Sequence, residues 1–243
     1  MKFRYFSDLH LEFIKPNYIK QFIHKIPHGF DEICILAGDI GNPFQPNYNF
    51  FMQYISRNFK KSFVITGNHE YYGHTIQETN DFLSTYFQQF HNITFLNNSF
   101  ECYENYCFVG STLWSKITNN LYEINDVYKI NDFDYLQYNL LNQSAVQFLT
   151  DTLETQHNCI IITHHMPSES LIDIKYKNKL LNQWFYCNMD DFIDKYQDKI
   201  ICWVYGHTHT PCITIKHNIH FLCNPIGYPN ENRKLYFDRS IEF

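Results

Sequence analysis

Residues 2–10 read KFRYFSDLH, a short apolar run that ends in an aspartate and a histidine. Four later stretches have the same form, with Ile, Val or Phe leading into Gly or polar residues: EICILAGD (32–39), SFVITGNHE (62–70), CIIITHH (159–165) and IICWVYGHTH (200–209). Apolar runs of this length, closed by Gly or polar residues, are typical of buried strands. The sequence therefore predicts five strands, each followed by a cluster of polar side chains.

Segments with apolar residues at helical spacing lie between or beside these strands. They are 17–26, 48–59, 77–90, 143–155 and 189–196. Strand and helix alternate in the first third of the chain, which favours βαβ units with parallel strands. Closely spaced strand patterns in 93–113 and 212–223 predict added β-structure. We expect an α/β fold and a single domain over residues 1–243.

Charge and composition disfavour several classes of function. The formal net charge is −6, with 19 Lys and Arg, so there is no basic field to attract nucleic acid or anionic membranes. A nuclease for long polymers would favour a basic track with interleaved aromatics, and the sequence has no clear one. No apolar stretch approaches membrane-spanning length and no signal peptide is visible, so we expect a soluble, intracellular and most simply cytoplasmic protein.

Cysteine usage predicts free thiols. The chain has eight cysteines, no CxxC pair, and most of the cysteines lie inside apolar runs. Buried free thiols in a reducing compartment are therefore favoured over a disulfide framework.

The polar clusters contain nitrogen and oxygen donors suited to metal ions. Singly, each has a plainer explanation, such as a turn, a helix cap or a buried histidine pair. Together they indicate a metal site, because ligands collect beyond the carboxyl ends of parallel strands. Imidazole with carboxylate suits Mn, Fe, Zn and similar ions, whereas structural zinc more often uses thiolates. The candidate residues are Asp8, His10, Asp39, Asn68, His69, His164, His165, His207 and His209.

These motifs, in this order along the chain, resemble the signature of the calcineurin-like metallophosphoesterases. The matching residues are Asp8-x-His10, Gly38-Asp39, Gly67-Asn68-His69-Glu70, His164 and Gly206-His207-Thr208-His209. Residues 110–114 (GSTLW) and 224–228 (NPIGY) also resemble a bacterial-type branch of small members. The protein Ser/Thr phosphatases of this superfamily carry GDxxDRG, whereas residues 38–44 read GDIGNPF, which counts against a protein phosphatase of that type. Ile226 stands where the branch often has Arg, which counts against a phosphate contact there.

The resemblance implies a β-sandwich flanked by helices, the four-layer αββα metallophosphoesterase fold, with the motifs on loops at one edge. It also implies two divalent metal ions, with Mn expected first and Fe, Zn or Ni as alternatives. Asp8, His10 and His209 would hold one ion and Asn68, His164 and His207 the other. Asp39 would bridge them, and a carboxylate is the side chain best suited to bridging two cations.

The implied reaction is phosphoester hydrolysis, in which a metal-bridging hydroxide attacks phosphorus in line. The resemblance places His69 where it protonates the leaving oxygen, with hydrogen bonding alone as the alternative. His165 is predicted to orient a ligand without binding metal itself.

The expected substrate is a small phosphorylated molecule. A phosphodiester is preferred, a phosphomonoester is the alternative, and a catalytically silent scaffold is disfavoured because every expected ligand position is filled. The segment 175–179 (KYKNK) either reaches over the cleft or, as favoured, is a solvated loop. The sequence assigns no substrate-binding residue and no oligomeric state.

Overall fold

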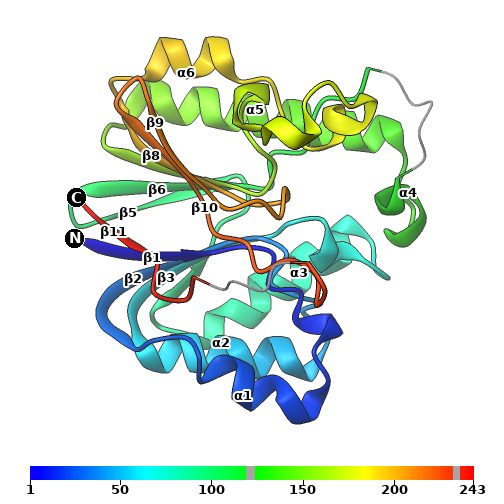
Figure 1. Ribbon diagram of the computed structural model, residues 1–243, viewed down its shortest axis with the longest axis vertical. Helices are drawn as coiled ribbons and strands as arrows, with labels where there is room; N and C mark the ends of the chain where they lie inside the picture. Colours follow the sequence, from blue (N-terminus) through cyan, green and yellow to red (C-terminus); the bar gives the residue numbers. More distant parts are fainter. Residues whose placement is uncertain (119–123, 232–235) are drawn as a thin grey trace.

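Two β-sheets face each other at the centre of the molecule in the computed structural model, which describes residues 1–118, 124–231 and 236–243 (Figure 1). The first sheet has the order β11-β1-β2-β3-β4. Its members are β1 (Lys2–Phe6), β2 (Gly29–Ala37), β3 (Phe59–Ile65), β4 (Ile93–Phe95) and β11 (Ser240–Glu242). The strands β1 to β4 pair in parallel, and only β11 is antiparallel to its neighbour β1.

The second sheet has the order β5-β6-β7-β8-β10-β9. Its members are β5 (Ser99–Tyr103), β6 (Tyr106–Ser111), β7 (Cys159–Thr163), β8 (Ile200–Tyr205), β9 (Cys212–Lys216) and β10 (Ile219–Cys223). The inner strands are parallel, whereas β5 and β9 form the edges and pair antiparallel. All five residues of β7 are buried, as expected for an apolar strand covered on both faces.

Helices cover the outer face of each sheet, so the molecule has four layers (Figure 1). The α-helices are α1 (Ile19–Ile23), α2 (Pro46–Asn58) and α3 (Ile76–Tyr86) on the first sheet, α5 (Tyr135–Thr155) and α6 (Asp190–Tyr196) on the second, and the short α4 (Asn125–Lys129) at one end. Short 3-10 helices cover Leu11–Phe13, Pro16–Tyr18, His69–Tyr71, Phe87–Gln89, Glu169–Leu171, Ile174–Tyr176 and Leu180–Trp184. Capping boxes begin α3 and α5, with Thr75 and Asp134 as the N-cap residues.

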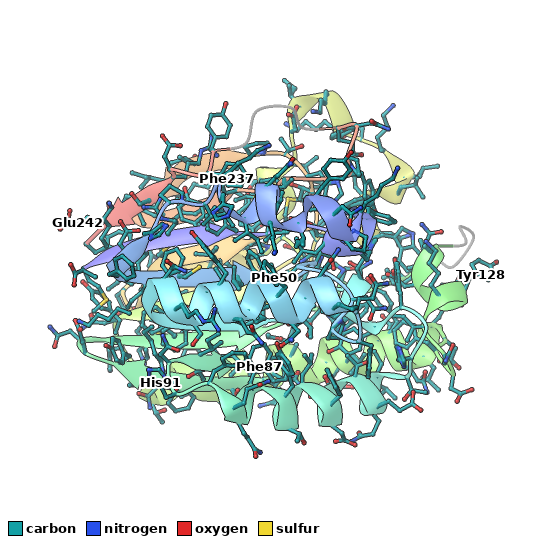
Figure 2. The ribbon with its side chains drawn as sticks, turned by 90° about the horizontal axis from the view of Figure 1, so that it is seen from below. Phe50, Phe87, His91, Tyr128, Phe237 and Glu242 are labelled. Carbon is teal, nitrogen blue, oxygen red and sulfur yellow. A yellow bond between two sulfur atoms is a disulfide. The ribbon has the colours of Figure 1, made fainter. Side chains whose placement is uncertain are left out.

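Three apolar clusters hold these layers together. Between the sheets, the rings of Phe63 and Phe108 stack with centroids 3.9 Å apart, within a cluster drawn from both sheets. A second cluster packs the first sheet against α1, α2 and α3 and includes Phe87 (Figure 2). Phe50 of α2, also labelled in Figure 2, is partly exposed to solvent. A third packs the second sheet against α5 and α6. The expected β-sandwich flanked by helices is confirmed.

The expectation of free thiols holds for six of the eight cysteines and is wrong for Cys102 and Cys107. Cys102 and Cys107 form a disulfide, because the β5–β6 hairpin places them opposite each other in register. The other six cysteines are free, and all but Cys212 are buried. Among the described residues, no helix is long and apolar enough to cross a membrane.

Candidate metal centre

The polar clusters meet at the end of the sandwich where the parallel strands of both sheets terminate. Asp8, Asp39 and Asn68 follow β1, β2 and β3 of the first sheet. His164 and His207 follow β7 and β8 of the second sheet. Because all five strands run parallel within their sheets, their carboxyl ends lie on one side of the molecule, and both sheets supply side chains to one centre.

Asp8, His10 and His209 form the first of two groups of converging side chains. The Nε2 atoms of His10 and His209 lie 3.0 Å apart, and His209 Nε2 lies 3.5 Å from Asp8 Oδ1. Donor atoms at this spacing could surround a single cation.

Asp39, Asn68, His164 and His207 form the second group. His164 Nε2 lies 3.4 Å from Asp39 Oδ2, 3.1 Å from Asn68 Oδ1 and 3.1 Å from His207 Nδ1. Asp39 Oδ2 is also 3.9 Å from His10 Nε2, so this carboxylate lies between the two groups. The structure thus brings together every side chain that the sequence predicts as a ligand.

The backbone at this centre adopts a conformation that non-glycine residues rarely use. The φ angles are 51° at Asp8, 48° at His10, 52° at Asp39, 68° at His207 and 48° at His209. Left-handed conformations at such residues are costly and cluster at functional sites. Five of the seven converging side chains therefore stand on left-handed backbone, although positive φ angles also occur elsewhere, for example at Glu104 and Leu113.

Two glycines of the motifs, Gly67 and Gly206, lie where loops approach so closely that a side chain would not fit. A Cβ atom on Gly67 would lie 2.1 Å from Asp39 Oδ1, and one on Gly206 would lie 2.8 Å from Asp8 Oδ2. In the space left free, the backbone N–H of His207 donates to Asp8 Oδ1 at 2.9 Å and that of His69 donates to Asp39 Oδ1 at 2.8 Å. Both carboxylates are therefore fixed by backbone donors.

Glu70 ties the loops after β2 and β3 together. Its buried carboxylate accepts hydrogen bonds from the backbone N–H groups of Asp39 (3.0 Å), Ile40 (2.7 Å) and Gly67 (2.7 Å). Burial and the neighbouring Asp39 raise the pKa of Glu70 to about 7. Glu70 belongs to the Gly67-Asn68-His69-Glu70 motif, but its local sequence does not predict this role.

The electrostatics of the centre suit a cation. Burial alone would lower the pKa of His164, but the carboxylates of Asp39 and Asp8 raise it to about 10. Although burial opposes the charged form of Asp39, His164 and His69 hold its pKa well below the ordinary value. The negative potential that keeps a proton on His164 also attracts metal ions. With oxygen and imidazole donors and no thiolate, the residues present fit divalent Mn, Fe, Zn or Ni.

His165 lies behind the second group. Its Nδ1 is 3.2 Å from the carbonyl of Thr112, its Nε2 is 3.3 Å from the hydroxyl of Tyr138, and its ring packs 4.2 Å from that of His207. Burial and the charge of His164 lower its pKa to about 3, so it is a neutral ring that packs against His207.

Two further residues orient Asn68, Asp126 and Tyr72, and neither contact is predicted by the sequence. The side-chain N–H₂ of Asn68 donates to Asp126 Oδ1 at 2.8 Å and to the hydroxyl of Tyr72 at 2.9 Å. The amide oxygen therefore points toward His164. Asp126 lies on α4, 58 residues away along the chain, and no local pattern marks it.

His69 lies at the opening of the centre. Its Nδ1 is 2.8 Å from Glu12 Oε1, and its Nε2 is 3.1 Å from the hydroxyl of Tyr228. Burial alone would lower its pKa, but Asp39 and Glu12 outweigh burial and raise it above the ordinary value. The ring therefore holds a proton more strongly than an ordinary histidine does.

A cleft of about 840 Å³ leads away from the centre. Asp39, His69 and His207 are among its lining residues, together with several residues of the segment 172–185 and with Tyr228 and Glu231. Lys175 and Lys179 are exposed and also line the cleft, so segment 175–179 is both solvated and close to the centre.

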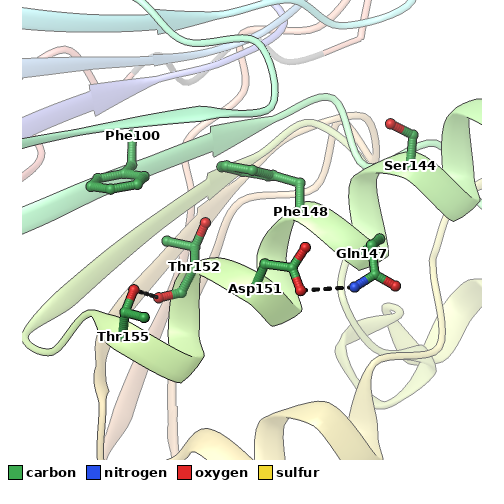
Figure 3. A pocket seen from close by; sticks show the side chains of 7 residues that line it. All are labelled: Phe100, Ser144, Gln147, Phe148, Asp151, Thr152 and Thr155. Atoms are coloured by element: carbon green, nitrogen blue, oxygen red, sulfur yellow. Dashed lines mark hydrogen bonds between the residues drawn. The ribbon is translucent and has the colours of Figure 1, made fainter.

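A second hollow, of about 490 Å³, lies beside Phe100 and α5 (Figure 3). Its single carboxylate, Asp151, accepts a hydrogen bond from Gln147 at 2.8 Å. No histidine or lysine lines it, so it is a poor candidate for a catalytic site.

Comparisons with known proteins identify the family and the fold of the chain. The model of the family described as calcineurin-like phosphoesterase matches residues 1–211. A protein of Acanthamoeba polyphaga mimivirus, described as uncharacterized, is 32% identical over 260 residues, which cover 94% of this chain and 91% of that protein. The crystal structure of phosphopantetheinyl hydrolase from Mycobacterium tuberculosis has a similar fold, with a TM-score of 0.77 and 19% identity over 99% of this chain and 95% of that one. A structure from Thermus thermophilus has a TM-score of 0.60 and 11% identity over 92% of this chain and 88% of that one.

Proposed function

The chain belongs to the calcineurin-like phosphoesterase family, and on that premise we propose that it hydrolyses small-molecule phosphodiesters at a dinuclear metal centre. Membership of the family makes it a phosphoric ester hydrolase that uses divalent metal ions. The proposal goes further in naming the ligands, the ester class and the leaving-group acid. We further propose that residues 1–243 form one domain, since one apolar cluster contains residues of both sheets.

The convergence of seven donor side chains carries the proposal. In the proposed centre, one ion is held by Asp8, His10 and His209. The other ion is held by Asn68, His164 and His207, and Asp39 bridges the two ions. The position of Asp39 Oδ2, 3.4 Å from His164 Nε2 and 3.9 Å from His10 Nε2, supports the bridging role. Bound divalent ions, Mn2+ first among them, would supply Lewis acidity toward phosphoryl oxygens and a nucleophile at neutral pH.

His69 is the proposed acid for the leaving group. Its Nε2 lies 3.9 Å from Asp39 Oδ2, beside the proposed bridge, and the ring lines the cleft. Because the carboxylates of Asp39 and Glu12 raise its pKa, the imidazole holds a proton more strongly than an ordinary histidine does. When the phosphorus–oxygen bond breaks, the leaving oxygen takes that proton from Nε2, which avoids releasing an alkoxide.

The extended cleft favours a diester over a monoester. A monoester needs room for one substituent, whereas the cleft continues from the centre along Lys175, Lys179 and Phe185. These side chains offer both cationic and apolar contacts to a leaving group. The structurally similar phosphopantetheinyl hydrolase suggests a phosphopantetheinyl diester as one substrate to include.

The test compares three substrates on Mn2+-loaded protein: bis-p-nitrophenyl phosphate, p-nitrophenyl phosphate and a phosphopantetheinyl diester. We expect turnover of the diesters to exceed that of the monoester, and Asp39→Asn to abolish both. Asp151→Asn, in the second hollow, is the matched carboxylate control and should retain full activity. A preference for the monoester would replace the diesterase proposal with a phosphatase. No turnover with Mn2+, Fe2+, Ni2+ or Zn2+ would overturn the proposed reaction for these esters.

A further inference from the structure

Glu12 lies between two histidines that have different proposed tasks. Its Oε1 is 3.2 Å from Nδ1 of His10 and 2.8 Å from Nδ1 of His69. The side chain is 12% exposed. We propose that Glu12 is a shared positioning residue, whose single carboxylate oxygen sets the orientation of both a metal ligand and the leaving-group acid. This inference rests on the roles proposed above for His10 and His69.

The chemistry of a carboxylate fixes which ring atoms carry protons. An ionised carboxylate only accepts hydrogen bonds, so Nδ1 of both histidines must be protonated. Nε2 of His10 is then free to bind an ion, and it lies 3.0 Å from Nε2 of His209. Nε2 of His69 is turned to the cleft side, 3.1 Å from the hydroxyl of Tyr228. One carboxylate thus orients both rings.

The backbone around Glu12 fixes the position of the carboxylate. Glu12 is the middle residue of a short 3-10 turn, which follows directly from the β1 loop. The preceding residues are held to the β2 loop, since the N–H of His10 donates to Asp39 O and that of Leu11 to Ile40 O, both at 3.0 Å. Leu11 is fully buried, which anchors the turn. A Cβ on Gly41 would lie only 3.3 Å from Glu12 Oε2, so the carboxylate also packs against this glycine.

Glu231 provides an internal comparison. Its carboxylate contacts Nδ1 of His209, a proposed ligand of the same ion as His10. It is 47% exposed, and its other hydrogen bond comes from the backbone N–H of Tyr228. Glu231 therefore supports ion binding without contact to His69, whereas Glu12 is placed to affect both ion binding and proton donation.

The experiment combines spectroscopy and kinetics on wild type, Glu12→Gln and Glu231→Gln. The protonation of each imidazole is first measured by 15N NMR of the diamagnetic, Zn2+-loaded wild type. We expect Nδ1 to be protonated in both His10 and His69. This measurement needs no variant, so it tests the inference even if Glu12→Gln fails to fold.

Mn2+ affinity and leaving-group dependence then separate the two carboxylates. Both variants should bind the first ion about 10- to 100-fold more weakly, as expected when a partner of a ligand is lost. At saturating Mn2+, Glu12→Gln should lose more rate on a dialkyl phosphodiester, whose leaving group is a poor alkoxide, than on bis-p-nitrophenyl phosphate, whose leaving group is p-nitrophenolate. Glu231→Gln should keep the wild-type ratio of the two rates.

Three results would overturn the inference. The first is an unprotonated Nδ1 on His69 in the wild type, and the second is the same leaving-group ratio in Glu12→Gln as in wild type. The third is a count of three bound ions per chain in the wild type and two in Glu12→Gln. That result would mean that His10, Glu12 and His69 form a metal site of their own. If the wild type hydrolyses no ester at all, the proposed function fails, but NMR and ion affinity still decide whether Glu12 positions the two rings.

Discussion

Replacing Gly67 by Ala tests how tightly the centre is built. The new Cβ would lie 2.1 Å from Asp39 Oδ1, about 1.3 Å closer than the 3.4 Å at which ordinary contact begins. It would also lie 2.7 Å from the backbone nitrogen of Asp39 and 2.7 Å from His164 Cε1. Because Asp39 is only 1% exposed, its carboxylate cannot move aside into solvent.

The displaced carboxylate should weaken both folding and ion binding. Forcing an extra methyl into a packed site costs about 1–3 kcal/mol of unfolding free energy. A shift of this size also breaks the 2.8 Å hydrogen bond from His69 N–H to Asp39 Oδ1 and moves the proposed bridge off its coordination distance. We expect Mn2+ affinity to fall at least about tenfold, which corresponds to roughly 1.4 kcal/mol.

Gly73→Ala is the control that separates crowding from backbone strain. Gly73 has φ of +85°, but a Cβ there would have no heavy atom within 4 Å. Its variant should lose about 1–2 kcal/mol of stability from the left-handed backbone alone and bind Mn2+ like wild type. Urea unfolding of metal-free protein and calorimetric titration with Mn2+ measure both quantities. Wild-type Mn2+ affinity in Gly67→Ala, or an equal loss of affinity in Gly73→Ala, would show that crowding of Asp39 does not control ion binding.

Three further predictions concern stability. Burial raises the pKa of the Cys159 and Cys187 thiols to about 11, so the folded state holds these protons more tightly than the unfolded state. Their contribution to the free energy of unfolding is complete below pH 9. It should be lost as pH rises from 9 to 11, by on the order of 2 kcal/mol per thiol. A free energy of unfolding in urea that stays constant over this pH range would contradict this prediction. Thr75→Ala removes the cap of α3 and should cost about 1 kcal/mol with unchanged Mn2+ affinity, and a change in affinity would be unexpected. Glu70→Gln points an amide N–H₂ at backbone donors and should cost on the order of 2–4 kcal/mol in urea unfolding, whereas a loss below about 1 kcal/mol would show that these hydrogen bonds contribute little.

The strands and the proposed ligands could be predicted because their signals are local. An apolar run followed by Gly38-Asp39 or Gly206-His207 predicts both a strand and a ligand from a stretch of about ten residues. Parallel pairing then places all such ends on one side of the sheets. The structure accordingly brings these side chains together.

The residues that orient the ligands could not be predicted in the same way. Asp126 reaches Asn68 from a five-residue helix, and Glu231 reaches His209 from a loop. Glu12 is only two residues from His10, but its contact with His69 crosses 57 residues of chain. Each contact depends on the distance between separate elements, which no spacing along the sequence encodes. The Cys102–Cys107 disulfide was missed for a related reason, since it depends on the register of a hairpin.

A titration of metal-free protein with Mn2+, with hydrolysis of bis-p-nitrophenyl phosphate followed at each addition, tests the proposed dinuclear centre most directly. We expect no hydrolysis without metal, little with the first equivalent, and a plateau at two equivalents per chain that Asp39→Asn never reaches. Full activity in the metal-free protein, or a plateau at one equivalent that Asp39→Asn also reaches, would contradict a dinuclear centre bridged by Asp39.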